Sequence, residues 1–191
     1  GIAVLYLSTY SAFAFYTFLS PVVALATLLV IVSVASFLSI RYNSLIIALM
    51  SIAGAFLTPT LLASDLSDQP FLLLGYVLVI DLEVLAVGTF RNWRWFSLIG
   101  LIGTYSLFGG WITGISDDEL ILAQIGISGA FVIFAGATTL SHIAWKRAVN
   151  PYDLALMTLN AVAYYAITFG LLWADYEAWF GIISLCLSAF Y

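Results

Sequence analysis

Long apolar stretches alternate with short polar joints along the whole chain, and this pattern predicts an all-α integral membrane protein. Most of the apolar stretches approach the roughly 20 residues that a helix needs to cross the hydrocarbon core of a bilayer. The last stretch is shorter. We therefore predict a bundle of about eight transmembrane helices joined by short loops. The predicted apolar segments cover approximately residues 1–19, 21–40, 44–63, 71–90, 95–114, 120–145, 152–173 and 178–191.

Several joints contain residues that are typical of helix starts. Ser20-Pro21 and Asn150-Pro151 each place a capping side chain before a proline at the first helical position. Asp153 follows where a negative charge favours the positive end of the helix dipole. The run from Ser116 to Glu119 matches the capping box S-x-x-E. Within the third segment, Pro59 is expected to kink or end the helix because proline lacks a backbone donor.

The charged residues predict the orientation of the chain. All five basic residues lie in alternate joints, and the charged residues of the joints between them are all acidic. By the positive-inside rule, the basic joints face the cytoplasm, so both ends of the sequence are expected on that side of the cell membrane. The basic residues are Arg41, Arg91, Arg94, Lys146 and Arg147, and the acidic joints hold Asp65, Asp68, Asp117, Asp118, Glu119, Asp175 and Glu177.

Composition narrows the possible partners and cofactors. Hydrophobic residues make up 64% of the 191 residues and charged residues only 8%, whereas a soluble domain has about 25% charged residues. With five lysines and arginines in all, nucleic acid is not expected as a partner. The single cysteine excludes an internal disulfide and a cysteine-cluster metal site. No cofactor is predicted, and the expected partners are membrane lipids and other membrane subunits or the remainder of a longer chain.

Motifs in the first half of the chain resemble a known family. They are the run from Gly1 to Leu7, the run from Gly54 to Pro59, the stretch from Tyr76 to Asp81, and the basic, tryptophan-rich run from Arg91 to Trp95. Together they are similar to a large bacterial family of predicted multi-pass membrane proteins of unknown function. The resemblance implies the fold class and a location in the bacterial inner membrane, but no activity. Because members are typically longer, residues 1–191 are expected to form a single transmembrane bundle that is a fragment, or the ordered part, of a longer polytopic protein.

Two carboxyl groups deep inside an apolar segment define a candidate intramembrane polar site. A charged group at the bilayer centre costs about 2.5–3.5 kcal/mol on insertion scales, so Asp81 and Glu83 should face protein or water. Residues two apart on a helix are separated by about 200°, so these two groups cannot bind one metal ion or substrate atom. Glu83 also departs from the family pattern, in which this position is usually small. Asn160, Tyr105 and Tyr164 are candidate hydrogen-bond partners of Asp81.

Asp81 has a functional and a structural interpretation. It could handle protons or ions in a transporter or carrier segment, or it could be a protonated or hydrogen-bonded carboxyl that joins helices. The structural interpretation is preferred because few other polar groups lie at the same depth. We therefore expect a non-enzymatic polytopic membrane protein that acts as a structural or scaffolding component of a membrane assembly. A transporter or carrier segment that uses Asp81 is the alternative.

Other candidate chemistries fail on spacing, so no catalytic, cofactor-binding or metal-binding residue is predicted. The run from Gly126 to Gly129 matches the G-x-S-G of an intramembrane serine protease. Its partner would be His142, the only histidine, which lies about 21 Å along the same helix, whereas a nucleophile and its base need about 3 Å. The small residues are instead expected to allow close helix packing. The pairs in question are Gly126 with Ala130, Gly110 with Gly114, and Ala166 with Gly170.

The predicted topology can be tested with single cysteines in a variant from which Cys186 has been replaced. Cysteines at Asn92 and Asn150 should be protected from an impermeant thiol reagent in intact cells, because both joints are predicted to be cytoplasmic. Cysteines at Ser67 and Asp118 should be labelled. Labelling of both pairs from the same side would contradict the eight-helix topology.

Overall fold

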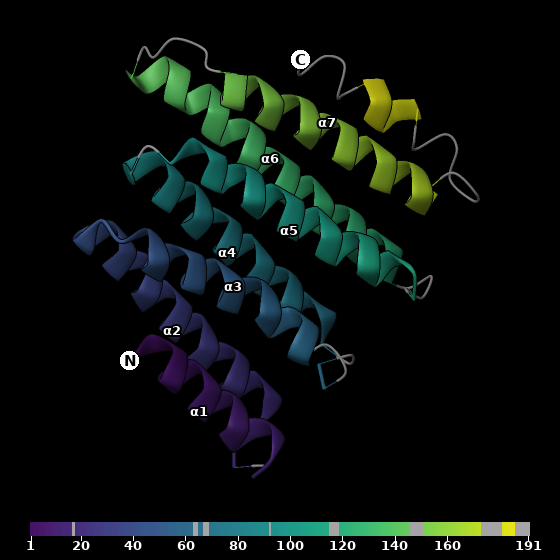
Figure 1. The fold of residues 1–191 in the computed structure, drawn as a ribbon. Coiled ribbons are helices and arrows are strands. Elements are labelled where there is room, and N and C mark those ends of the chain that lie inside the picture. Colours follow the sequence, from purple (N-terminus) through teal and green to yellow (C-terminus); the bar gives the residue numbers. More distant parts are fainter. Residues whose placement is uncertain are drawn as a thin grey trace. The chain divides into compact units, whose positions relative to one another are not determined.

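The described part of the chain is α-helical with short connections (Figure 1). The computed structural model describes residues 1–16, 18–62, 65–66, 69–91, 93–114, 119–145, 151–172 and 181–185, and contains no strand within these ranges. The prediction of an all-α membrane protein is confirmed. The helices are α1 (Ile2–Ala14), α2 (Pro21–Tyr42), α3 (Leu45–Leu62), α4 (Pro70–Arg91), α5 (Arg94–Ile112), α6 (Leu120–Trp145) and α7 (Pro151–Leu172), followed by a helical stretch at 181–185.

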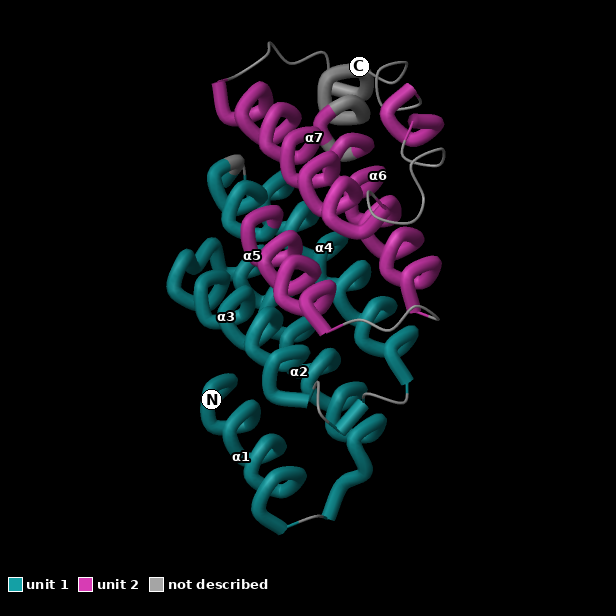
Figure 2. The backbone as a smooth tube through the Cα atoms, turned by 90° about the vertical axis from the view of Figure 1, so that its right-hand side faces the viewer, with its two compact units in different colours: residues 1–100 teal, residues 101–191 magenta. Residues whose placement is uncertain are grey.

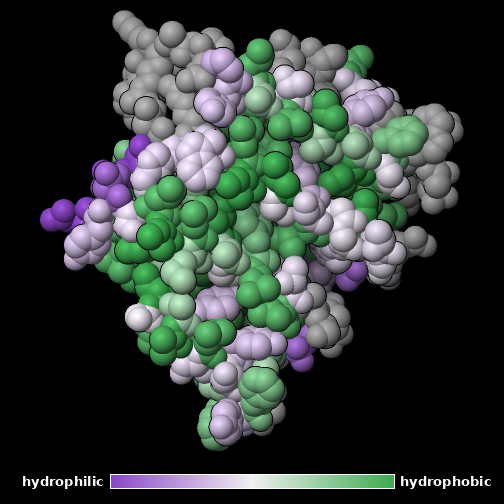
Figure 3. All heavy atoms as spheres, in the orientation of Figure 1, coloured by the Kyte–Doolittle hydropathy of each residue, from purple (hydrophilic) through white to green (hydrophobic). Residues whose placement is uncertain are grey.

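Five helices in the described ranges are long and apolar enough to cross a membrane, namely α2, α3, α4, α7 and the part of α5 from Trp95 to Ile112. Their outward residues are themselves large and apolar. Hydrophobic side chains accordingly cover much of the surface that Figure 3 shows. Contact of such a surface with lipid or with another apolar helix is favourable, whereas its exposure to water is unfavourable. Examples are Val30, Phe37, Ile46, Leu82, Phe90 and Val162.

The helix boundaries of the described residues agree with the predicted segments to within a few residues, except at the end of the first segment. Of the predicted segment 178–191, only residues 181–185 are described. α1 ends at Ala14, although the first segment was predicted to extend to about residue 19. Ser20 precedes a proline and adopts an extended backbone with ψ 155°, which separates α2 from the residues before it. The predicted cap is confirmed, since the Ser20 Oγ accepts a hydrogen bond from the Val23 N–H at 3.4 Å. At 13 residues, α1 spans about 20 Å, which is less than the thickness of a bilayer core.

Some sequence predictions fall on residues outside this description. α7 begins at Pro151, as predicted, and Asp153 lies in its first turn. The preceding Asn150 and most of the capping box before α6 lie outside the described residues, and so does the side chain of His142. The remaining residues of this kind are Asn92, Ser67, Asp68, Ser116, Asp117, Asp118, Lys146, Arg147, Asp175, Glu177 and Cys186.

The described helices form two compact units, residues 1–100 and residues 101–191 (Figure 2). In the first unit, α2 contacts α1, α3 and α4, and α3 contacts α4. The short connection between α2 and α3 is made possible by Asn43, whose left-handed backbone (φ 53°) ends α2. In the second unit, α6 packs against α7. The single bundle over residues 1–191 stays a prediction.

Two glycines allow the start of α5 to approach α4 closely within the first unit. A Cβ atom at Gly88 would lie 2.5 Å from the Ser97 Oγ, and one at Gly100 would overlap the Val84 side chain. The sequence analysis did not select either residue. Of the glycines that it did select, Gly110 and Gly114 have no described neighbour within 4 Å of such a Cβ, and Gly170 has only the Ile112 Cδ1 at 3.9 Å. The expectation of close packing at Gly110 and Gly114 is therefore wrong for the described residues, because spacing identifies a helix face but not its partner.

Alanine substitutions can test this contact. Gly100→Ala should destabilise the protein by roughly 1–3 kcal/mol, because the new methyl group collides with Val84 in a packed interface. Gly75→Ala is the matched control, since no described atom beyond the neighbouring backbone of its own helix lies within 4 Å of its Cβ position. The control should gain up to about 1 kcal/mol from the higher helix propensity of alanine. The measurement is thermal unfolding in detergent, and equal stability of the two variants would contradict a tight contact at Gly100.

Candidate functional site

Pro59 interrupts the backbone hydrogen bonding of α3 in the first unit, because it lies inside this helix, which continues to Leu62. Proline has no N–H, so the carbonyl of Ala55, four residues earlier, loses its intrahelical donor. The hydroxyl of Tyr76 on α4 donates to this carbonyl at 3.1 Å. In an apolar interior an unsatisfied carbonyl costs several kcal/mol. Tyr76 thus replaces the missing backbone donor. The helix does not end at Pro59, since α3 continues for three more residues.

Tyr6 of α1 meets the same stretch of α3 from another side. Its hydroxyl lies 2.9 Å from the Thr58 Oγ1 and 3.2 Å from the carbonyl of Gly54. The Thr58 hydroxyl also donates to the Gly54 carbonyl, at 2.9 Å. A Cβ atom at Gly54 would lie 3.2 Å from the Tyr6 ring, so the absence of a side chain at Gly54 leaves room for this ring. We call this buried cluster the tyrosine junction; it comprises Tyr6, Gly54, Ala55, Thr58, Pro59 and Tyr76.

The tyrosine junction explains why separate sequence motifs occur together. Its residues come from the run Gly1 to Leu7, the run Gly54 to Pro59 and the start of the stretch Tyr76 to Asp81. α3 supplies the carbonyls of Gly54 and Ala55, of which the second lacks its intrahelical donor, and α1 and α4 supply hydroxyl donors. The motifs are therefore parts of one helix-joining contact.

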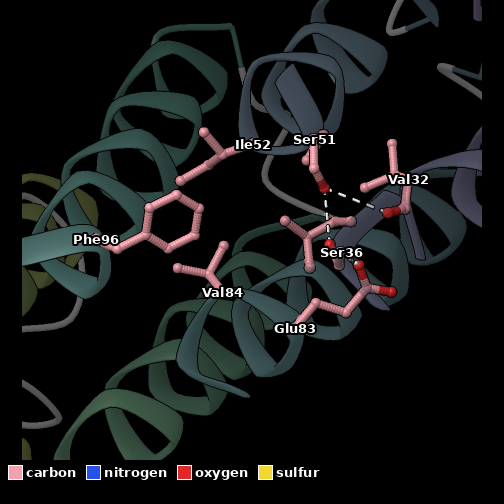
Figure 4. Close-up of a pocket in the computed structure, with 9 residues that line it drawn as sticks. Val32, Ser36, Ser51, Ile52, Glu83, Val84 and Phe96 are labelled. Carbon is pink, nitrogen blue, oxygen red and sulfur yellow. Dashed lines mark hydrogen bonds between the residues drawn. The ribbon is translucent and has the colours of Figure 1, made fainter. Parts of the chain in front are cut away.

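A second polar cluster in the same unit surrounds Glu83, one of the predicted site residues. Its two carboxyl oxygens form hydrogen bonds with the hydroxyls of Ser33 and Ser36 on α2. Ser36 Oγ also lies 2.7 Å from the Ser51 Oγ of α3. We call Ser33, Ser36, Ser51 and Glu83 the serine–glutamate site. Figure 4 shows the Glu83 carboxyl directed toward Ser36, with Ser51 beyond it.

A small cavity of about 10 Å³ adjoins three of these side chains, those of Ser36, Ser51 and Glu83. This volume is close to the minimum for one water-sized group. Within the described residues that line the cavity, Glu83 is the only charged one. The other lining residues are apolar: Val32, Ile52, Ala55, Ile80, Val84 and Phe96.

Sequence reasoning missed the serines of this site. A usable signal was present, because Ser33, Ser36 and Ser39 recur every three residues in an apolar segment and therefore share one helix face. Spacing alone could not show that this face meets Glu83. Ser51 gave no such signal, since it reaches the site only through the packing of α3 on α2.

Asp81, the second predicted site residue, is fully buried, as expected for a carboxyl group in an apolar segment. It does not line the cavity beside Glu83. Asp81 lies on the stripe of α4 that also contains Val84 and Gly88, at positions i, i+3 and i+7. The two carboxyl groups therefore occupy different faces of α4, as their spacing predicts.

Asn160, the third predicted site residue, belongs to the second unit. Its Oδ1 accepts a hydrogen bond from the Tyr105 hydroxyl at 2.8 Å, and its Nδ2 donates to the Phe131 carbonyl at 3.1 Å. This fully buried amide thus joins α5, α6 and α7. Asn160 and Tyr105, both proposed as partners of Asp81, bond to each other.

Tyr164, the remaining candidate partner of Asp81, joins a polar cluster between α6 and α7. Its hydroxyl lies 3.2 Å from both the Gln124 Nε2 and the Ser128 Oγ. Gln124 also donates to the Thr168 Oγ1 at 3.4 Å. The serine of the G-x-S-G run is therefore part of a helix contact. Among the described residues, no group of three or more His, Cys, Asp or Glu side chains is placed to hold a metal ion.

Helices that can cross a bilayer, with their polar side chains bonded to one another, define a polytopic α-helical membrane protein. The chain belongs to the family described as Predicted membrane protein (DUF2339), whose model matches residues 1–191. This match confirms the family resemblance of the sequence motifs and extends it over the second half of the chain. No curated protein and no solved structure matches the chain.

A double-mutant cycle can test the role of Tyr76. Tyr76→Phe should destabilise the protein by about 0.6–1.7 kcal/mol, the range for hydrogen bonds between membrane helices, because the Ala55 carbonyl loses its donor. Pro59→Ala restores an N–H that can reach this carbonyl. Tyr76→Phe should therefore cost much less when Pro59 is also replaced, as measured by unfolding in detergent. Strictly additive effects would show that Tyr76 does not compensate for the proline.

Proposed function

We propose that this chain is a non-enzymatic structural component of a membrane assembly in the bacterial inner membrane. The observation that supports this role is how its buried polar groups are used: they bond to neighbouring helices. In the first unit Tyr6 and Tyr76 bond to α3, and in the second unit Asn160 joins three helices. Such bonds give each unit a defined arrangement in a solvent where the hydrophobic effect cannot drive helix association.

Membrane lipids and other membrane subunits, or the remainder of a longer chain, are the proposed partners. Large side chains such as Phe37, Ile46, Phe90 and Ile121 are at least 66% exposed on helices of this chain. Lipid tails and apolar helices are the surroundings in which these side chains cost no free energy.

The proposed orientation places the basic joints in the cytoplasm. Arg41 and Arg91 lie in the last turns of α2 and α4. Because α3 runs between these two helices in the chain, two successive crossings bring both arginines to the same side of the membrane.

A transporter or carrier segment that uses an intramembrane carboxyl group is the second candidate. In the sequence, Asp81 was the preferred residue for this role. The cavity favours Glu83 instead, because Glu83 lines it together with two serine hydroxyls while Asp81 does not line it.

Substitution of Asp81 tests whether this residue is structural or serves a carrier. If the residue is structural, Asp81→Asn should assemble and melt like the unmodified protein, because the amide keeps the size and the hydrogen-bonding capacity. Asp81→Leu should be less stable by about 0.5–2 kcal/mol. The measurements are detergent melting, size of the native assembly and growth of the host. A well-folded Asp81→Asn protein that no longer supports growth would favour the carrier, because an amide cannot exchange a proton near neutral pH.

A further inference from the structure

Glu83 occupies an environment in which an ionised carboxylate would be costly. It lies eight residues before the end of α4 at Arg91, which places it about 12 Å from that end along the helix axis. It is half-buried, and its neighbours Val79 and Leu82 on α4 are exposed apolar residues. None of the residues that line the adjoining cavity is basic. A charge here would be paired with hydroxyls alone, in an apolar layer.

The number of hydroxyl hydrogens gives a second, independent argument. Ser33, Ser36 and Ser51 make five contacts: Ser33 with the Leu29 carbonyl and Glu83, Ser36 with Glu83 and Ser51, and Ser51 with the Val32 carbonyl. A serine hydroxyl has one hydrogen to donate, so these side chains supply three hydrogens for five contacts. With an ionised Glu83, which only accepts, two contacts would lack a hydrogen.

A proton on Glu83 supplies a fourth hydrogen and halves this deficit, from two contacts to one. Ser33 then donates to the Leu29 carbonyl at 2.9 Å, and the Glu83 Oε1 donates to Ser33. Ser51 donates to Ser36 at 2.7 Å, and Ser36 donates to the Glu83 Oε2 at 3.2 Å. Only the contact between Ser51 and the Val32 carbonyl, at 3.3 Å the longest of the set, is left without a hydrogen.

We infer that the serine–glutamate site is a proton-binding site, in which Glu83 is a protonated carboxyl that can exchange its proton. When the proton leaves, the Ser33 hydroxyl rotates from the Leu29 carbonyl to the Glu83 Oε1, and the site then holds a carboxylate with two hydroxyl donors. When a proton returns, it adds to Oε1 and the rotation is reversed. The inference goes beyond the proposed scaffold and does not depend on it.

The surroundings of Glu83 contain few other groups that titrate. α2 and α3 contribute the three serines, and the start of α5 contributes Phe96. On α4 itself, Tyr76 lies two turns earlier, and its hydroxyl is bonded to the Ala55 carbonyl. Asp81 is turned about 200° away from Glu83. A change in the pH dependence of this site can therefore be assigned to Glu83 and its serines.

Labelling with dicyclohexylcarbodiimide, an apolar reagent for protonated carboxyl groups, tests the inference on the full chain in membrane vesicles. The carboxyl oxygen adds to the central carbon of the carbodiimide and the carboxyl proton moves to its nitrogen, so nothing leaves. Peptide mass spectrometry should find the label on Glu83, decreasing as the pH is raised, and absent in Glu83→Gln. Asp81 is the internal control and should react much more slowly because it is fully buried.

Ser33→Ala supplies a readout that a purely structural role would not change. Labelling should persist to a pH about one unit higher, because the ionised carboxylate loses a stronger hydrogen bond than the neutral carboxyl does. Thr27→Val is the matched control: it removes a similar bond to the carbonyl four residues earlier, on the same helix, without touching Glu83. This control should keep the original pH dependence.

Three outcomes would overturn the inference. Absence of label on Glu83 at every pH tested would mean that the carboxyl is ionised or shielded. An unchanged pH dependence in a folded Ser33→Ala protein would remove Ser33 from the site. Protection of Glu83 by sodium chloride, but not by choline chloride at the same ionic strength, would identify a monovalent cation as the ligand in place of the proton.

Discussion

The need to satisfy every backbone polar group in an apolar solvent organises the first unit of this protein. Pro59 leaves the Ala55 carbonyl without its intrahelical donor, and Tyr76 supplies a hydroxyl in its place. This bond sets the register of α4 against α3. Glu83 lies seven residues after Tyr76, which is almost two full helical turns, so both side chains project from one face of α4. The same contact that compensates for a proline therefore turns Glu83 toward the serines of α2.

Close packing on the neighbouring stripe of α4 supports this arrangement. Val84 and Gly88 meet Gly100 and Ser97 at the start of α5. α4 is consequently held on two sides, by hydrogen bonds to α3 and by contact with α5. A structural role for the tyrosine junction is compatible with a proton-binding role for the serine–glutamate site. The tyrosine junction positions α4, and Glu83 of the serine–glutamate site lies on the face of α4 that is thereby turned toward α2. In the second unit, Asn160 serves a comparable structural purpose with an amide that both donates and accepts.

The acids of the candidate site could be selected from the sequence, whereas the hydroxyl groups around Glu83 could not. Asp81 and Glu83 were recognisable because a carboxyl group in an apolar segment is costly wherever the segment packs. The sequence analysis assigns the carrier role to Asp81, whereas the cavity and the hydroxyl groups lie at Glu83. Small-residue spacing likewise suggested Gly110 and Gly114, while the tight contacts are at Gly88 and Gly100. In each case residue spacing identifies a helix face but not the helix that packs against it.

The sequence by itself determined the class of protein, the helical segments and several of their ends. Hydropathy, caps and prolines act within a few residues of one another, and membrane insertion depends on each segment separately, so local rules are sufficient. Only the tertiary structure decided which donor reaches the Ala55 carbonyl, which hydroxyls surround Glu83 and which glycines allow close approach. The hydrogen bonds to the Ala55 carbonyl and to Glu83 join residues that are 21 to 50 positions apart in the chain. They depend on the rotation and depth of each helix relative to its neighbours, and one-dimensional periodicity does not contain that information.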